Sequence, residues 1–188
     1  MPSIVAIPRG VQRDEAWANG AGSTTVILRE PDDANWRVRV SVAKVDRDGP
    51  FSELPGTRRT LLPLDAAMSL RFPDGCGLHA ARLGTLQFDG SPAPYGLLPE
   101  GPTRDFNLML RGGARGEATA HVLRDPAPLI LDTSPRWLVY LDSGRAAIRI
   151  DGQPALALNP HDAALVIPED DPARVEGAGE IILVKLYA

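Results

Sequence analysis

The 188-residue sequence has one cysteine, three histidines and few aromatic residues, which make up 5% of the chain. The single thiol, Cys76, excludes an intrachain disulfide and a zinc site built from cysteines. The net charge of −4 gives no whole-molecule attraction for nucleic acid or for an anionic membrane. No apolar run approaches the length of a membrane span, and the N-terminus does not resemble a signal peptide. We therefore expect a cytoplasmic protein that binds neither nucleic acid nor membrane.

Helical periodicity is also missing from the sequence. Nowhere does a period of 3.6 residues persist for three turns. Instead, 18 glycines and 18 prolines are spread through the chain and separate short apolar runs, which is typical of an all-β sandwich or barrel. We expect strands at residues 3–7, 24–29, 36–45, 60–64, 67–72, 83–89, 118–123, 137–141, 146–150, 155–158, 163–167 and 181–186.

The stretch at residues 101–111 carries charged residues, an amide and a thioether between two turns that contain glycine. If this stretch is a strand, alternation places Asp105, Asn107 and Met109 on one face, with Phe106 and other apolar residues on the opposite face. A carboxylate and a carboxamide cost free energy to bury without partners. Two interpretations follow: an edge strand whose polar face meets water, or a strand that directs Asp105 and Asn107 into a pocket.

The strand expected at residues 36–45 offers a second polar face. Arg37, Arg39 and Ser41 alternate there with Trp36 and a series of valines. Two arginines on one strand face commonly form a solvated surface. If this face points into a barrel instead, the guanidinium of Arg39 can bind an anion beside the hydroxyl group of Ser41.

No pattern in the sequence predicts a metal site or a catalytic nucleophile. The histidines, His79, His121 and His161, are far apart, and without clustered His or Cys a transition-metal site is not expected. No Ser or Cys stands in a strand-turn-helix elbow. We therefore predict no metal, no cofactor and no catalytic residue. A dyad of a carboxylate with His79 or His121 stays open as the enzymatic alternative.

The second half of the sequence resembles a cupin jelly roll, in which strands end at Gly, Asp-Gly and Pro-x-Asp turns. Residues 168–177 resemble the second cupin motif, with Ala173 in the place of the metal-binding histidine. The first half contains analogous strands. The resemblance implies an all-β bicupin with two related jelly-roll barrels. We assign them to residues 1–112 and 113–188, packed tightly as one unit with a possible exchange of strands.

Six motifs occur in an order that resembles the HutD/Ves family, and they cover roughly the first 111 residues. They are Trp17-x-Asn19-Gly20-x-Gly22-x-Thr24-Thr25, Arg39-Val40-Ser41-Val42-Ala43, Asp48-Gly49-Pro50-Phe51-Ser52, Pro55-Gly56-x-x-Arg59, Phe88-Asp89-Gly90 and Asp105-Phe106-Asn107-x-Met109. Each motif is weak alone, but the ordered series is specific. The chain departs from the family pattern at Ala18, Ala21, Val26 and Arg58, and the last two stand where the family has acidic residues.

The resemblance implies a metal-free fold with a small-molecule pocket and a link to bacterial histidine utilisation or to stress induction. The ligand-binding residues that it implies are Trp17, Asn19, Arg39, Ser41, Phe51, Ser52, Arg59, Asp105, Asn107 and Met109. We expect Arg39 and Arg59 to hold a small carboxylate such as urocanate or formylglutamate, in a regulatory role, while Asp105 orients an arginine.

Other functions stay open at this point. A metal-independent isomerase or epimerase could act on a sugar or an organic acid, with Asp105 or a histidine as proton carrier. A scaffold that binds a partner protein is a third hypothesis. Because cupins often pair through sheet edges, a homodimer is the expected assembly.

Overall fold

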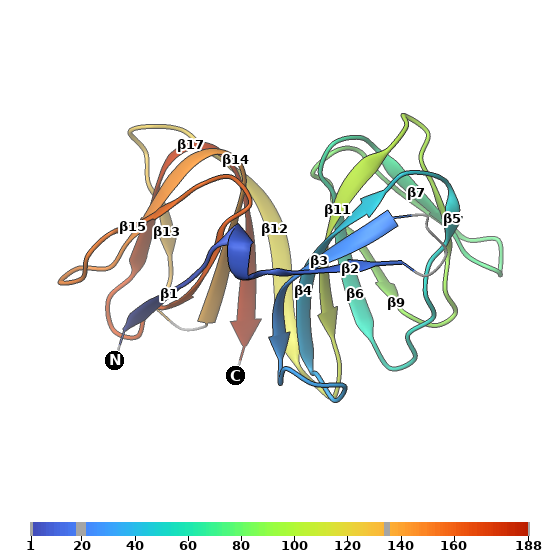
Figure 1. The fold of residues 1–188 in the computed structure, drawn as a ribbon, viewed down its shortest axis with the longest axis horizontal. Coiled ribbons are helices and arrows are strands. Elements are labelled where there is room, and N and C mark those ends of the chain that lie inside the picture. Colours follow the sequence, from blue (N-terminus) through green and yellow to red (C-terminus); the bar gives the residue numbers. More distant parts are fainter. Residues whose placement is uncertain (1, 18–21, 134–135, 188) are drawn as a thin grey trace. The chain divides into compact units, whose positions relative to one another are not determined.

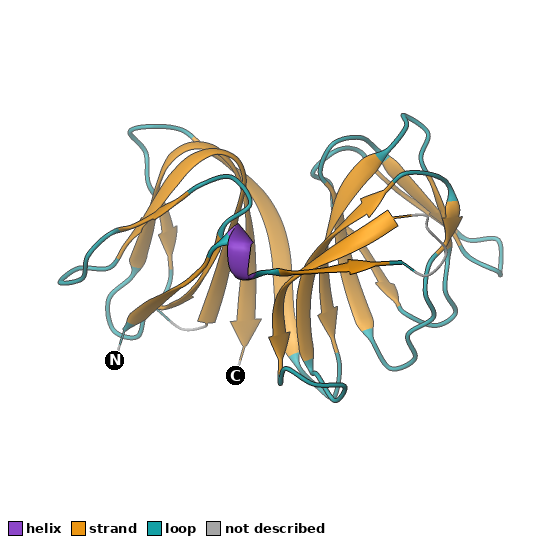
Figure 2. Ribbon diagram, viewed as in Figure 1, coloured by secondary structure: helices purple, strands orange, loops and turns teal. Residues whose placement is uncertain are grey.

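The computed structural model describes residues 2–17, 22–133 and 136–187. Strands dominate these residues (Figure 2), and the helical element among them is a single 3-10 turn, η1 (Arg9–Val11). The all-β prediction is thus confirmed. Within the described ranges, no helix has the length and apolar character needed to cross a membrane.

The chain divides into two compact units. The first comprises residues 1–12 and 115–188, and we call it the terminal unit; the second comprises residues 13–114, and we call it the middle unit. The division near residue 114 lies close to the boundary expected after residue 112. The first twelve residues, however, group with the C-terminal strands rather than with the N-terminal half, because the first strand pairs with a strand near the C-terminus.

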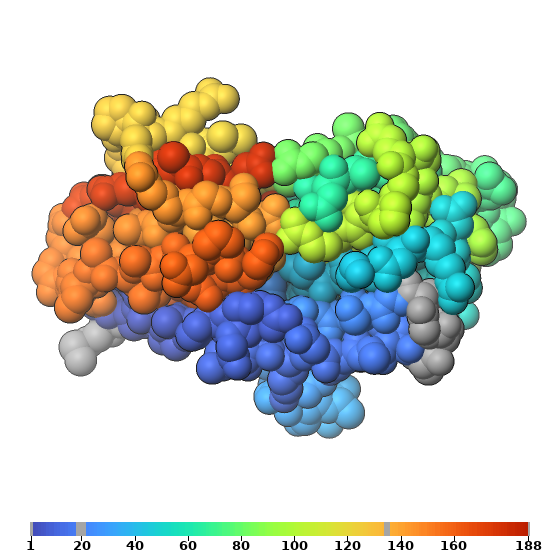
Figure 3. Space-filling view, turned by 45° about the horizontal axis from the view of Figure 1, so that its top comes forward, coloured from blue at the N-terminus to red at the C-terminus, as the bar shows by residue number. Residues whose placement is uncertain are grey.

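The terminal unit is built on one seven-stranded sheet. Its order is β1–β16–β14–β17–β12, with β13 paired to β17 and β15 paired to β14. These strands are β1 (Ser3–Ile7), β12 (Arg115–Leu123), β13 (Leu129–Leu131), β14 (Arg136–Arg149), β15 (Leu156–Leu158), β16 (Ala163–Ile167) and β17 (Ala173–Tyr187) (Figure 1). In the space-filling view, the dark blue N-terminal segment lies along orange residues of the C-terminal strands, as the pairing of β1 with β16 requires (Figure 3).

Strand β14 runs continuously through residues 142–144, where we expected a break between separate strands at residues 137–141 and 146–150. A bulge between Leu141 and Ser143 absorbs the irregularity against β17. Gly144 has a φ of +84°, and a Cβ there would lie 2.2 Å from the Ala178 carbonyl oxygen. Glycine therefore allows the two strands to approach closely, and the polar residues bend one long strand rather than end it.

The core of the terminal unit is formed by alternate residues of its long strands. Val139, Leu141, Ile181 and Leu183 are four of its buried members. Among the described residues of this unit, Asp142 is the only buried one with a charged, amide or aliphatic hydroxyl side chain. The interior of the terminal unit is thus formed almost entirely by apolar side chains.

The middle unit contains two antiparallel sheets. The six-stranded sheet has the order β2–β3–β4–β11–β6–β9, and the four-stranded sheet has the order β5–β10–β7–β8. The first comprises β2 (Arg13–Ala16), β3 (Gly22–Glu30), β4 (Val38–Val45), β6 (Arg58–Pro63), β9 (Leu86–Asp89) and β11 (Thr103–Leu110); the second comprises β5 (Gly49–Pro50), β7 (Met68–Arg71), β8 (Gly77–Ala80) and β10 (Tyr95–Leu97).

The two sheets of the middle unit pack through an apolar cluster to which both contribute. Its buried members are Ala43, Val45, Leu61, Leu86 and Phe88 from the larger sheet and Met68, Leu70 and Ala80 from the smaller one. The strand expected at residues 83–89 begins only at Leu86. Leu83 has a φ of +62°, outside the range of a strand, so the chain turns before β9 starts.

Candidate functional site

The site is organised by β11, which lies between β4 and β6 in the six-stranded sheet. Met109 on β11 is opposite Arg39 on β4 and Arg59 on β6. Asn107, two residues before Met109 on β11, is opposite Ser41 on β4. Because directly opposed residues project from the same face of a sheet, the polar residues of three strands form one surface.

Asp105 and Asn107 are 1% and 2% exposed, and β11 is paired on both sides. The interpretation of residues 101–111 as an edge strand with a solvated face is therefore wrong. The strand order is responsible, because β4 and β6 enclose β11 although the three segments are far apart in sequence. The polar side chains of β11 therefore point into the interior of the middle unit.

A cavity of about 450 Å³ lies on this polar face. Strands β2, β3, β4, β6 and β11 and the segment after β5 contribute to its wall. The structure brings together on this wall nine of the residues expected from the sequence: Trp17, Arg39, Ser41, Phe51, Ser52, Arg59, Asp105, Asn107 and Met109. Asn19 lies outside the described residues. A cavity of this volume suits a small organic molecule.

Arg59 is a buried cation in the cavity wall, with 4% of its surface exposed. Its Nη2 donates a hydrogen bond to Asn107 Oδ1 at 3.0 Å. Its guanidinium carbon lies 5.0 Å from the centroid of the Phe51 ring and 5.1 Å from that of Phe88, within cation–π range. Burial lowers the pKa of Arg59 to about 10, and the carboxylate of Asp105 limits the fall. Arg59 therefore stays charged at neutral pH.

Asp105 is the buried carboxyl group of the site. Asn107 Nδ2 donates to Asp105 Oδ1 at 2.5 Å, and the backbone of Ala43 is a further hydrogen-bond partner. Burial raises the pKa of Asp105 to about 6, although the charge of Arg59 and these two hydrogen bonds oppose the shift. Asn107 lies between the two ionisable groups, because it accepts from Arg59 and donates to Asp105.

Arg39 is the second cation of the cavity, and its side chain is 18% exposed. Its Nη2 donates to Glu15 Oε2 at 3.0 Å. Burial lowers the pKa of Arg39, and the Glu15 carboxylate opposes this effect. Among the described residues, two buried side-chain atoms have no hydrogen-bond partner, and these are the Nε atoms of Arg39 and Arg59. Arg39 and Arg59 therefore each have one donor without a partner among the described residues.

The aromatic residues give the cavity an apolar wall. Trp17 and Phe51 both pack against the core cluster of the middle unit. Trp17 Nε1 donates to Thr24 Oγ1 at 2.8 Å, which fixes the indole. Glu15, Thr24 and Arg47 also line the cavity and were not expected from the sequence.

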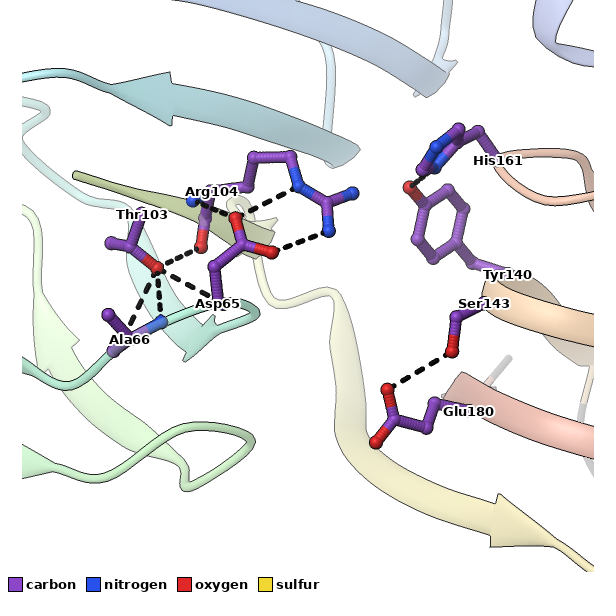
Figure 4. A network of polar contacts seen from close by, with 8 residues as sticks. All are labelled: Asp65, Ala66, Thr103, Arg104, Tyr140, Ser143, His161 and Glu180. Atoms are coloured by element: carbon purple, nitrogen blue, oxygen red, sulfur yellow. Dashed lines mark hydrogen bonds and ion pairs between the residues drawn. The ribbon is translucent and has the colours of Figure 1, made fainter.

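The three histidines stand apart from this cavity, whose described lining contains none of them. His79 and His121 each contact a neighbouring hydroxyl group on their own sheet. His161 in the terminal unit has its Nδ1 3.1 Å from the hydroxyl of Tyr140 (Figure 4). The described lining of this cavity therefore offers no histidine for the carboxylate–histidine dyad that the sequence left open. Among the described residues, no three His, Cys, Asp or Glu side chains cluster as metal ligands would.

A second polar group in the middle unit secures a turn rather than a cavity. Arg104 donates from Nε and Nη2 to the two carboxylate oxygens of Asp65 at 3.0 and 2.7 Å. The hydroxyl of Thr103 accepts from the backbone N–H groups of Asp65 and Ala66 (Figure 4). Burial of Asp65 opposes the fall of its pKa, but the hydrogen bonds from Arg104 prevail and lower it. These contacts hold the connection between β6 and β7.

Comparison with protein families gives one match over most of the chain. A family model described as HutD matches residues 10–183. Protein Ves of Escherichia fergusonii is 32% identical over 100 residues. That alignment covers 50% of this chain and 51% of the Ves protein, so the chain spans about half the length of this relative.

Solved structures resemble the whole chain. A conserved protein of unknown function from Pseudomonas aeruginosa PAO1 has a TM-score of 0.89 and 24% identity, covering 99% of this chain and 100% of its own. HutD from Pseudomonas fluorescens SBW25, described for a formate condition, has a TM-score of 0.77, 22% identity and coverage of 99% and 100%. The pirin YhhW of Escherichia coli, in complex with nickel(II), has a TM-score of 0.71, 9% identity and coverage of 98% and 99%. These likenesses show a cupin-like, all-β fold.

Proposed function

This chain belongs to the HutD family, and on that premise we propose that the cavity of its middle unit binds a small carboxylate. The observation that carries the proposal is the pair of buried Nε–H groups of Arg39 and Arg59, which lack partners among the described residues. A buried donor without an acceptor destabilises a protein by about 1–3 kcal/mol. A carboxylate offers acceptor oxygens and the complementary charge.

The remaining residues of the cavity have complementary roles in this proposal. Ser41 and Ser52 supply neutral hydrogen bonds, while Asn107 holds Arg59 in place. Trp17 and Phe51 contact the carbon skeleton of the ligand. Asp105 acts on Arg59 through Asn107 and through its charge rather than by direct contact with the anion.

Family membership supports a narrower version of the proposal. We propose that the ligand is an intermediate of histidine breakdown, such as urocanate or formylglutamate, and that the role is regulatory. The solved HutD of Pseudomonas fluorescens was described for a condition containing formate, the smallest carboxylate. We further propose that each unit is a cupin-type jelly-roll barrel, which would make the chain a bicupin; the division into two all-strand units supports this.

The test is a thermal-shift screen of the purified chain with formate, urocanate and formylglutamate, in the presence and absence of EDTA. A ligand at 100 times its Kd stabilises by about 2.7 kcal/mol. For a protein of this size we expect a rise in Tm of roughly 5–11 °C. Calorimetry then compares Arg39→Ala, which should abolish binding, with Arg37→Ala. Arg37 donates to the Gly112 carbonyl outside the cavity, and its removal should leave the affinity unchanged. Retained affinity in Arg39→Ala would exclude Arg39 from the site.

The raised pKa of Asp105 favours a second candidate, a metal-independent isomerase or epimerase of a sugar or an organic acid. A buried carboxyl group with a pKa of about 6 can both take and return a proton near neutral pH. This candidate requires turnover that survives EDTA and disappears in Asp105→Asn. Ligand binding without turnover, across a panel of hydroxy acids and sugars, would contradict it.

A further inference from the structure

Glu15 places a carboxylate of the protein itself at the proposed anion site. It lies on β2, an edge strand of the six-stranded sheet, and all four residues of β2 are exposed. Its Oε2 accepts the hydrogen bond from Arg39, and Glu15 lines the cavity together with Ala16 and Trp17. Glu15 thus places a carboxylate on the same guanidinium that the proposed function assigns to the ligand, through Nη2 rather than the unpaired Nε.

A second arginine, Arg29 on β3, is within reach of Glu15. Glu15 Oε1 lies 3.9 Å from Arg29 Nη1. Arg29 also donates from Nε to Asp32 Oδ1 at 2.9 Å, and Asp32 is more than half exposed. Glu15 therefore contacts two arginines: Arg39, which lines the cavity, and Arg29, which is opposite Arg39 on β3 and is not among the residues that line the cavity.

The exposure of the two partners is unequal. The Glu15 side chain is 44% exposed, whereas Arg39 is 18% exposed. Ion pairs in such partly solvated positions stabilise proteins by about 0–1 kcal/mol, so the carboxylate can leave Arg39 at little cost. The donor on Arg39 Nε, in contrast, is buried and has no partner among the described residues.

We propose that Glu15 is an internal counter-ion, which occupies Arg39 in the empty cavity and moves toward Arg29 when a carboxylate ligand binds. This inference rests on the proposed function. Two carboxylates on one guanidinium repel each other, so the measured affinity is that of the ligand in competition with Glu15. Glu15 thereby weakens the binding of every carboxylate and excludes anions that make few other contacts in the cavity.

The substitution Glu15→Gln tests this inference, because it keeps the shape of the side chain and removes its charge. With urocanate as the probe in calorimetry, we expect the Kd to fall about tenfold, which corresponds to about 1.4 kcal/mol. Urocanamide, the uncharged amide of the same skeleton, should show no such gain. The matched control is Asp14→Asn. It removes the same charge from the same strand, but alternation directs Asp14 to the other side of β2, where it accepts from the Thr25 hydroxyl.

The outcomes separate this inference from the proposed function. If wild-type protein binds urocanate, formate or formylglutamate but Glu15→Gln binds equally or more weakly, the inference is overturned and the proposed function stands. The same holds if Asp14→Asn gains as much affinity, because the effect is then one of net charge. If neither wild type nor Glu15→Gln binds any of the three, the proposed function fails and the inference fails with it. Binding by Glu15→Gln alone would support both.

Discussion

The terminal and middle units fill their interiors with different kinds of side chain, although both are built from antiparallel strands. Among the described residues, the terminal unit buries Asp142 as its one charged side chain, while the middle unit buries Ser41, Arg59, Asp105 and Asn107 on one face of a sheet. Burying such groups costs free energy unless hydrogen bonds satisfy them. A hydrocarbon core needs no such partners, whereas the buried polar residues of the middle unit do.

The two interiors separate residues that stabilise the fold from residues that are candidates for binding. The long strands of the terminal unit carry apolar residues whose packing is sensitive to each methylene group. In the middle unit, hydrogen bonds connect Arg59, Asn107 and Asp105, and the Nε–H of Arg59 has no partner among the described residues. A buried polar network with an unpaired donor contributes less to stability than a fully satisfied one, which is why we propose that this network serves binding.

The largest expected effect comes from making the terminal unit polar. Leu183 is 3% exposed in the core of that unit, and Leu183→Asn buries an amide where the residues around it are hydrocarbon. We expect the free energy of unfolding to fall by about 5 kcal/mol, from lost apolar burial and from an unsatisfied amide. Urea unfolding measures this, with Leu183→Met as the control that keeps the volume. A loss below 1 kcal/mol would show that this core tolerates polar groups.

The next effect removes the cation of the middle unit. Arg59→Met leaves the Asp105 carboxylate buried without it, and we expect a loss of about 4 kcal/mol at pH 8. The loss should be smaller at pH 5, because the pKa of Asp105, already raised to about 6 by burial, rises further without the charge of Arg59. A carboxyl group with a raised pKa in the folded state contributes most at low pH, and its contribution is lost as pH rises through that pKa.

Urea unfolding at pH 5 and pH 8 measures the effect of Arg59→Met. Adding Asp105→Asn should abolish the difference between the two pH values, since an amide does not titrate. Arg58→Met, on the same strand but exposed, is the control and should change stability by less than about 0.5 kcal/mol. An Arg59→Met variant that is equally destabilised at both pH values would place the cause in lost packing rather than in the charge of Asp105.

Alternation along single strands predicted most of the cavity wall. It placed Asp105, Asn107 and Met109 on one face and Arg39 with Ser41 on another, because side chains of a strand alternate sides. It could not decide whether these faces meet water. That depends on the pairing of β4 with β11 and of β11 with β6, which is a property of the tertiary fold.

Glu15 shows what alternation cannot detect. Strand β2 has four exposed residues and no apolar pattern, so nothing in its residues predicts a strand there. Its position follows from pairing with β3, which sets Glu15 opposite Thr24. The long strand β14 illustrates the same limit in the fold: a bulge between Leu141 and Ser143 and a close approach at Gly144 continue the strand where the sequence pattern breaks, because β17 lies beside it.

The smallest effect distinguishes the cavity wall from the core within the middle unit. Phe51 and Phe88 lie at nearly equal distances from Arg59, but of these two rings only Phe51 lines the cavity. Phe51→Leu removes the cation–π contact between Arg59 and the ring that lines the cavity. We expect the Kd for urocanate to rise about threefold to fivefold, or about 0.5–1 kcal/mol.

Phe88→Leu is the matched variant for the ring in the core. It should lower the free energy of unfolding by roughly 1–2 kcal/mol, because Phe88 is 8% exposed in the apolar cluster, and it should leave the Kd within about twofold. Equal effects of both variants on the Kd would mean that the aromatic residues act only by holding Arg59 in place. Unequal effects would mean that the ligand contacts Phe51 itself, so that the middle unit joins a core and a binding surface around one arginine.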